Sequence, residues 1–187
     1  MVKVFVFGDR SERKFTEKLC QILNGFGGVL GFYNGNVIET GNAYEFLLCD
    51  CERLEKFDLS DAVLIFKTRQ KNCRNQKLNV SQRVISIVNE GNQKAFHMLK
   101  DSLVPTLTCG MSPKDTLTLS SISDTGAVVS VQREIKDLNH QTIEPCEIKI
   151  NYEDRFSDYE LLSACAVLLL ADKIKDGRLD FSRKKEV

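Results

Sequence analysis

The sequence predicts an α/β fold, organised as one three-layer domain over residues 1–187, with a mostly parallel sheet and C-terminal antiparallel hairpins. Three observations support this. Strand-like and helix-like segments alternate as far as Gly110, the apolar period changes to two from Thr116 onward, and no linker composition marks the junction. With 187 residues, 42% hydrophobic and 28% charged, the chain has the size and composition of one globular domain.

The first elements are a strand, a helix and a second strand. Residues 2–7 are mainly β-branched and aromatic and are followed by Gly8, which is typical of a buried strand that leaves through a tight turn. Ser11 is placed to cap the following helix, whose apolar residues recur at helical spacing as far as Phe26. Residues 29–33 form the second predicted strand, and Asn34, Gly35 and Asn36 form a turn.

The segments at 2–7, 45–52, 62–66 and 84–88 are predicted to be neighbouring, mainly parallel strands. Consecutive strands among them are joined by helices or long connections, which favour right-handed parallel crossovers. Residues 53–61 are expected to be a short helix or turn. Residues 68–82 are polar, basic and without apolar periodicity, and we expect them to be the most mobile internal segment because little burial offsets their ordering entropy.

The stretch from 84 to 115 organises the chain, because it predicts a strand, a helix over 93–103, and a strand at 107–110. After it, residues 117–119, 129–131 and 148–150 alternate apolar and polar, which indicates antiparallel strands with one solvated face. The apolar helix predicted at 159–170 is too short to span a bilayer and should pack on the sheet. The basic stretch 178–185 is expected to be a solvated, frayed terminus.

Composition excludes several kinds of partner. Lys plus Arg and Asp plus Glu number 26 each, so no net field attracts nucleic acid or an anionic membrane surface. No apolar run approaches the roughly 20 residues that cross a bilayer, and the N-terminus lacks a signal-peptide pattern. Seven scattered cysteines are most simply reduced and buried. We therefore expect a cytoplasmic protein with no nucleic-acid and no membrane partner.

Several segments taken together resemble the central, ATP-binding domain of the Mur ligase family. GDRSERK (8–14) lies where that domain carries its phosphate-binding P-loop, and EFLLCDCERLEKFDLSDAVLIFK (45–67) resembles the following strand, acidic residue and strand. VISIVNEGNQKAFHMLK (84–100) and TLTCGMSPKD (106–115) resemble the family's later motifs. The resemblance implies a Mur ligase central-domain-like, Rossmann-like fold. It also implies a nucleotide or anion site at Gly8, Asp9, Arg10, Ser11 and Asn89.

The departures from the family pattern weigh against catalysis. A P-loop needs glycines whose backbone N–H groups converge on phosphates, a Lys, and a Ser or Thr for Mg²⁺. GDRSERKF keeps only Gly8, while Glu12 or Arg13 stands where the Lys is expected, and Glu90-Gly91 replaces the two acids that follow the family's Asn. The family's two other domains, which bind the nucleotide-linked substrate and the amino acid, have no counterpart in these residues, so we expect no ligation.

Other candidate sites compete with ordinary packing. Cys49 and Cys51 share one face of a strand and could hold a metal or form a redox pair, but paired Cys/His clusters are absent, so a packed ladder is favoured. Cys109 could be a nucleophile or a buried strand-end residue. His97 is expected to be solvated. The helix N-terminus at Gly8 to Ser11 could accept an anion or be a plain strand–helix turn.

Three functions follow from these alternatives. The first is a non-catalytic Mur ligase-like protein, a pseudoenzyme that acts as a scaffold or interaction module, with no catalytic residue, metal or cofactor, and with an unidentified protein partner or a second copy. The alternative is a nucleotide- or anion-binding module that uses the degenerate phosphate-loop site. The third is an enzyme of unrecognised chemistry based on Asp50, Glu52 or Cys109, for which the sequence offers no complete set of acid, base and nucleophile.

Overall fold

The computed structural model describes residues 1–33, 35–41, 43–53, 61–70 and 83–182. It contains one eleven-stranded sheet in the order β13-β12-β9-β8-β7-β6-β5-β1-β4-β2-β3, and a small two-stranded sheet, β10-β11. The strands are β1 Val2–Phe7, β2 Gly28–Tyr33, β3 Asn36–Thr40, β4 Tyr44–Cys51, β5 Ala62–Phe66, β6 Val84–Asn89, β7 Thr106–Gly110, β8 Leu117–Ile122, β9 Gly126–Val131, β10 Ile135–Lys136, β11 Thr142–Ile143, β12 Cys146–Asn151 and β13 Arg178–Asp180.

The centre of the sheet is parallel. Strands β6, β5, β1 and β4 lie side by side in that order and pair in parallel, which confirms the predicted neighbourhood of these four segments. Antiparallel pairing occurs where β9 joins β8 and β12, and again at the opposite edge between β2 and β3. The predicted α/β class, with a mostly parallel sheet and antiparallel strands toward the C-terminus, is confirmed.

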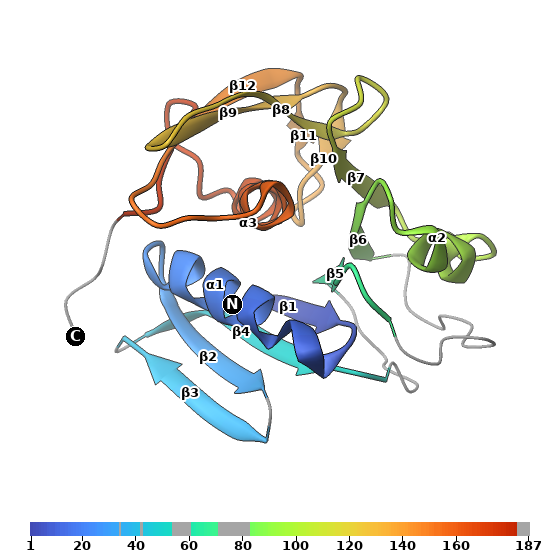
Figure 1. The fold of residues 1–187 in the computed structure, drawn as a ribbon, viewed down its shortest axis with the longest axis vertical. Helices are drawn as coiled ribbons and strands as arrows, with labels where there is room; N and C mark the ends of the chain where they lie inside the picture. Colours follow the sequence, from blue (N-terminus) through green and yellow to red (C-terminus); the bar gives the residue numbers. More distant parts are fainter. Residues whose placement is uncertain (34, 42, 54–60, 71–82, 183–187) are drawn as a thin grey trace.

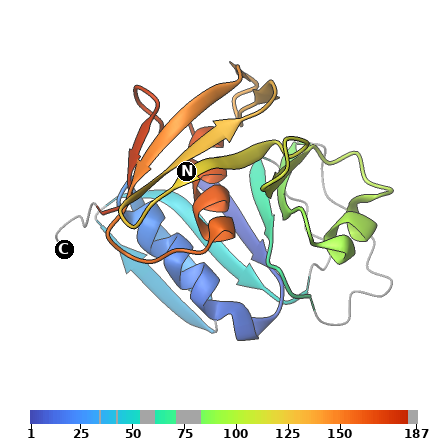
Figure 2. The same ribbon diagram turned by 45° about the horizontal axis from the view of Figure 1, so that its top comes forward.

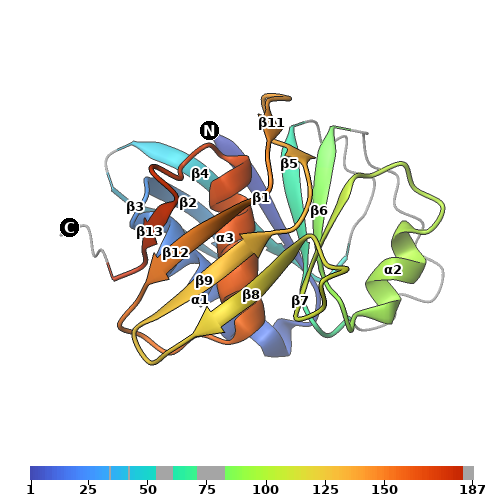
Figure 3. The ribbon, with the colours of Figure 1, turned by 90° about the horizontal axis from the view of Figure 1, so that it is seen from above.

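Helices lie on both faces of this sheet. Helix α1 (Arg13–Asn24) and helix α3 (Asp158–Leu170) pack on one face and against each other, whereas α2 (Gln93–Leu99) covers β5 and β6 on the other face (Figures 1 and 2). The sheet curls so that β8, β9 and β12 lie over α3 on the side away from α1 (Figures 1 and 3). This arrangement creates two apolar cores, one on each face.

The sequence explains the burial of α3. Its run LLSACAVLLL is apolar all round, as expected for a helix covered on every side. The helix begins with a capping box, in which the Ser157 hydroxyl accepts from the Glu160 amide and the Glu160 carboxylate accepts from the Ser157 amide. In the described part of the chain, no helix is both long enough and apolar enough to cross a membrane.

Tyr159 ties α3 to the parallel strands. Its hydroxyl donates to the carbonyl oxygens of Phe66 (2.6 Å) and Ile87 (3.3 Å), and its ring stacks on Phe15 of α1 at 5.4 Å. We expect Tyr159→Phe to lower the free energy of unfolding by about 1–3 kcal/mol, because both buried carbonyls lose their side-chain donor. Urea denaturation measures this. The control is Tyr33→Phe, which removes the hydroxyl of a half-buried tyrosine at the end of β2. An equal loss of stability in both variants would contradict the role given to the Tyr159 hydroxyl.

Several element boundaries differ from those expected. The helix predicted over 93–103 ends at Leu99, where Ser102 turns back and bonds the Leu99 carbonyl. Ser11 does not cap the first helix: residues Arg10–Glu12 form a 3-10 turn capped by the Asp9 carboxylate, and α1 begins only at Arg13.

Strands β3 and β13 were not predicted, and part of the terminus expected to fray pairs with β12 instead. The segment predicted to be a short helix or turn falls mostly within residues 54–60, and most of the segment predicted to be mobile falls within 71–82. Both of these ranges lie outside the described residues.

Candidate functional site

The turn formed by residues 8–11 joins β1 to α1 at the carboxyl edge of the parallel strands. Ligands of α/β proteins bind at this edge, next to the point where strand order reverses. The order β5-β1-β4 places β1 at such a point, because the chain leaves β1 toward β2 on one side and later returns to β5 on the other. The fold therefore places Gly8, Asp9, Arg10 and Ser11 where a ligand would be expected.

Asn89 ends β6, two strands away from β1 along the same edge. Its side-chain oxygen accepts a bond from the Gly91 amide at 3.0 Å, so the side chain closes its own loop. The neighbouring Asn92 caps α2 and donates to the carbonyl oxygen of Lys67 at 2.8 Å. The candidate residues therefore share an edge, but Asn89 is engaged within the β6–α2 connection.

The backbone N–H groups of the turn are all used within the chain. Five consecutive amides, those of residues 8 to 12, each donate to a protein oxygen. The bonds are Gly8 to the Cys51 carbonyl (3.1 Å), Asp9 to the Arg69 carbonyl (2.8 Å), Arg10 to Glu52 Oε1 (3.3 Å), Ser11 to Asp9 Oδ1 (2.9 Å) and Glu12 to the Asp9 carbonyl (3.1 Å). An anion bound here would have to displace these acceptors.

Glu12 links the turn to the segment that follows β5. Its carboxylate accepts from the Arg69 amide at 2.7 Å and from the Thr68 hydroxyl, so it joins the start of α1 to the segment that follows β5. Among the described residues, the carboxylates of Asp9 and Glu12 border this turn, and their negative charge disfavours a bound anion.

Lys67 lies buried beneath the turn. Its side chain has no exposed surface, and its ammonium nitrogen lies 2.7 Å from both carboxylate oxygens of Asp50, at the end of β4. The nitrogen is also 3.4 Å from the Asp9 carbonyl, and Asp50 accepts from the Thr16 hydroxyl of α1 at 2.6 Å. Asp50 is therefore part of a buried, neutralised ion pair that links β4, β5 and α1.

Sequence reasoning did not single out Lys67. One pattern pointed toward it: a lysine placed directly after the wholly apolar strand AVLIF, where a charge is buried only if it has a partner. The identity of that partner comes from the fold, because Asp50 and Thr16 belong to other elements. Asp50, one of the candidate catalytic residues, is instead held in an ion pair by Lys67.

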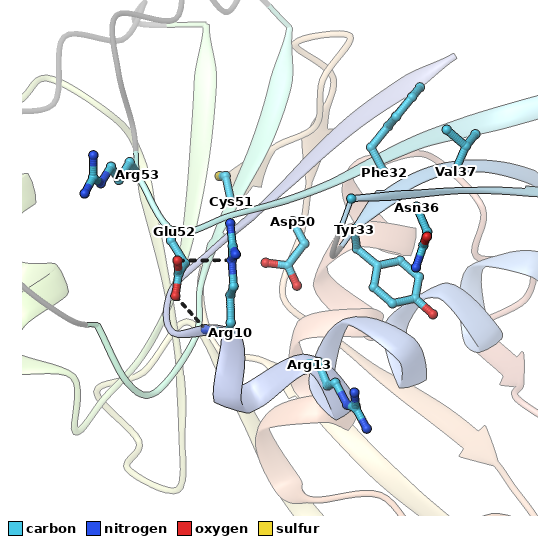
Figure 4. A pocket seen from close by; sticks show the side chains of 11 residues that line it. Arg10, Arg13, Phe32, Tyr33, Asn36, Val37, Asp50, Cys51, Glu52 and Arg53 are labelled. Carbon is cyan, nitrogen blue, oxygen red and sulfur yellow. Dashed lines mark hydrogen bonds and ion pairs between the residues drawn. The ribbon is translucent and has the colours of Figure 1, made fainter.

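A hollow of about 630 Å³ opens beside the turn, between the N-terminal end of α1 and the β2–β3 hairpin (Figure 4). Phe32, Tyr33, Asn36 and Val37 line it from the hairpin. Arg10, Arg13, Asp50, Cys51, Glu52 and Arg53 line it from α1 and the end of β4. Glu52 is paired with Arg10, with 3.1 Å between Oε2 and Nε, and Asp50 lies in the centre of the view. The hollow combines aromatic and aliphatic surface with arginines.

The cysteines of the described residues do not form a reactive or metal-binding group. Cys49 and Cys51 are half-buried and unoxidised, and burial raises the pKa of the Cys51 thiol to about 12. Cys109 is wholly buried, and desolvation raises its pKa far above the ordinary value. Both thiols are therefore protonated and unreactive near neutral pH. Among the residues described, no three His, Cys, Asp or Glu side chains cluster to hold a metal ion, and His97 is exposed.

No model of a known protein family matches the sequence, and no curated protein sequence does. Solved structures do match in fold. A UDP-N-acetylmuramoyl-L-alanyl-D-glutamate–2,6-diaminopimelate ligase aligns with a TM-score of 0.50 and 9% identity, over 92% of this chain and 43% of its own. The fold of this chain is Mur ligase-like.

Two further Mur ligases align similarly. A UDP-N-acetylmuramate:L-alanyl-gamma-D-glutamyl-meso-diaminopimelate ligase from Neisseria meningitides gives a TM-score of 0.52 and 11% identity, over 94% of this chain and 62% of its own. MurF ligase from Thermotoga maritima, in complex with ADP, gives a TM-score of 0.50 and 12% identity, over 99% of this chain and 48% of its own. The chain thus spans about half the length of these Mur ligase-like neighbours, and at such identities the likeness concerns the fold.

Proposed function

We propose that this chain is a non-catalytic protein with a Mur ligase-like fold that acts as an interaction module. The observation that carries the proposal is the closed turn at residues 8–11. A P-loop leaves its amides free for phosphate oxygens, whereas the five amides here already have acceptors in the chain. According to this proposal, the turn has lost the phosphate binding of a P-loop and serves only to connect β1 with α1.

The charge distribution supports the same proposal. Phosphoryl transfer depends on a lysine and Mg²⁺ to stabilise charge around the γ-phosphate. The nearest lysine beneath the turn, Lys67, is buried and bonded to Asp50, and so is engaged in the fold. The lysine after the turn, Lys14, is exposed at the second position of α1. We propose a cytoplasmic protein of one domain, with reduced cysteines, whose partner is another protein.

The first test concerns ATP. We expect the purified protein to show no ATPase activity in a steady-state assay with Mg²⁺, and no heat of ATP binding by calorimetry, because the turn offers no free amides. Arg10→Ala/Arg13→Ala should leave this baseline unchanged. ATP hydrolysis that disappears in the double variant would overturn the proposal, because it would show that these arginines take the role of the missing lysine.

One observation favours the alternative, a nucleotide- or anion-binding module. Arg10 and Arg13 stand at the turn and line the hollow, and a guanidinium can pair with phosphate oxygens. Binding would require Glu52 to release both the amide and the side chain of Arg10. Calorimetry decides between the two proposals: one-to-one ATP binding without turnover would favour the alternative over an interaction module with a closed turn.

A further inference from the structure

We infer that the free edge of β3, together with the hollow beside it, binds an extended acidic segment of another protein. This inference rests on the proposed role as an interaction module and specifies its surface and its partner. The segment would add a strand to the sheet along β3, and its acidic side chains would face the arginines of the hollow.

The edge offers backbone groups in a defined pattern. In the described chain, β3 ends the sheet order and pairs only with β2. Tyr33 opposes Asn36 across a two-residue turn, which makes them a hydrogen-bonded pair. Alternation along the strand then directs the backbone groups of Asn36, Ile38 and Thr40 toward β2, and those of Val37 and Glu39 outward. An added strand would pair with the latter two.

The strand lacks the usual protection of a sheet edge. Proteins blunt edges with short strands, lysine, proline or bulges. The opposite edge follows this rule, because β13 has three residues. Strand β3 has five residues, NVIET, with neither Lys nor Pro and with Glu39 as its one charge. Its backbone pattern therefore favours pairing with a further strand.

Apolar side chains are exposed beside this edge. Val37 is 57% exposed and its cross-strand neighbour Phe32 is 42% exposed. Figure 4 shows both on the face opposite Tyr33 and Asn36, pointing away from α1. They offer contact to the apolar residues of an incoming strand, whose alternate side chains fall on the same face.

Charge decides which partner suits the hollow. Its lining contains Arg10, Arg13 and Arg53 against Asp50 and Glu52. Asp50 is already neutralised by the buried Lys67, and Glu52 by Arg10. Arg13 is then held only by an exposed pair with Glu17, at 4.0 Å along the helix, and Arg53 has no ion pair among the described residues. A second copy pairing through β3 would bring only Glu39 from its own edge, whereas an acidic segment supplies complementary carboxylates.

The test uses random linear peptides displayed on phage, selected against the full chain, with the most enriched peptide then synthesised and its affinity measured by fluorescence polarisation. We expect enrichment of Asp, Glu and β-branched residues. Val37→Pro should weaken binding about tenfold or more, because it removes an outward N–H donor while leaving the bonds to β2. Val37→Thr, which keeps that donor, is the matched control and should bind nearly as the parent does.

A charge-reversed variant, Arg13→Glu/Arg53→Glu, should also lose about tenfold in affinity and most of the salt dependence. Thermal unfolding checks that each variant folds. Absence of enrichment, a basic or proline-rich consensus, or binding that survives Val37→Pro would overturn the inference. So would a dimer in sedimentation that Val37→Pro dissociates, since this would assign the edge to a second copy. Each of these results leaves the ATP test of the proposed function unaffected.

Discussion

Replacing Lys67 with methionine should lower the free energy of unfolding by about 3–5 kcal/mol, a large part of the stability of a typical domain. The ammonium group bonds both oxygens of Asp50, whose side chain is only 9% exposed. Removing the cation leaves a carboxylate buried without its counter-charge, and among the described residues the Thr16 hydroxyl is its remaining hydrogen-bond donor. Urea denaturation monitored by circular dichroism measures the loss.

Two controls separate the ion pair from the loss of packing. Lys67→Met/Asp50→Asn should recover more than half of the lost stability, because Asn is neutral and can still accept from Thr16. Arg10→Met breaks the exposed pair with Glu52, where the side chains are 73% and 34% exposed, and should cost no more than about 1 kcal/mol. A Lys67→Met variant as stable as Arg10→Met would show that Asp50 is not effectively desolvated.

The elements that were predictable from sequence are those specified by local pattern. The strands β1, β5 and β6 are predominantly apolar, as expected for parallel strands covered on both faces. Their connections are too long for hairpins, which fixed the parallel direction. Helix α3 is an apolar run of helical length preceded by a Ser-x-x-Glu cap. In each case the physical cause lies within the segment itself.

Elements that depend on partners outside their own segment were not predicted. Strand β3 has a mixed sequence, NVIET, and becomes a strand because β2 supplies its ladder. The same holds for β13, which is ordered by β12. The closing of the turn at residues 8–11 has this cause as well, since Cys51, Glu52 and Arg69 reach it from β4 and from the segment after β5.

Sequence reasoning recognised that the glycines of a P-loop are missing, but not what fills the space. Asp9 appeared as a candidate residue of an anion site, whereas in the structure its carboxylate caps the 3-10 turn by accepting from the Ser11 amide. Glu12 appeared as a replacement for a lysine, whereas it bonds the Arg69 amide. The Asp9 cap is a local contact, two residues apart, whereas the Glu12 contact joins segments 57 residues apart, which no local pattern records.

The second large expected effect on stability concerns Gly8, the glycine of the turn. Gly8→Ala should lower the free energy of unfolding by about 3 kcal/mol, at the upper end of overpacking costs. A Cβ atom on Gly8 would lie 2.5 Å from the Lys67 Cβ and 2.7 Å from the Arg69 carbonyl oxygen, and the Gly8 φ is +156°. Since the Asp9 amide bonds that same carbonyl at 2.8 Å, the turn cannot retreat without breaking the bond.

The matched control is Gly31→Ala on β2, where the nearest atom to an added Cβ is 3.6 Å away, an ordinary contact. We expect this variant to keep its stability within about 0.5 kcal/mol. Hydrogen exchange locates the damage: in Gly8→Ala the amides of Gly8 and Asp9 should exchange faster, because both bonds to the neighbouring segments lengthen. Unchanged exchange at these two amides, or equal stability of the two variants, would show that the turn has room beneath it. Either result would contradict a turn closed by five bonded amides.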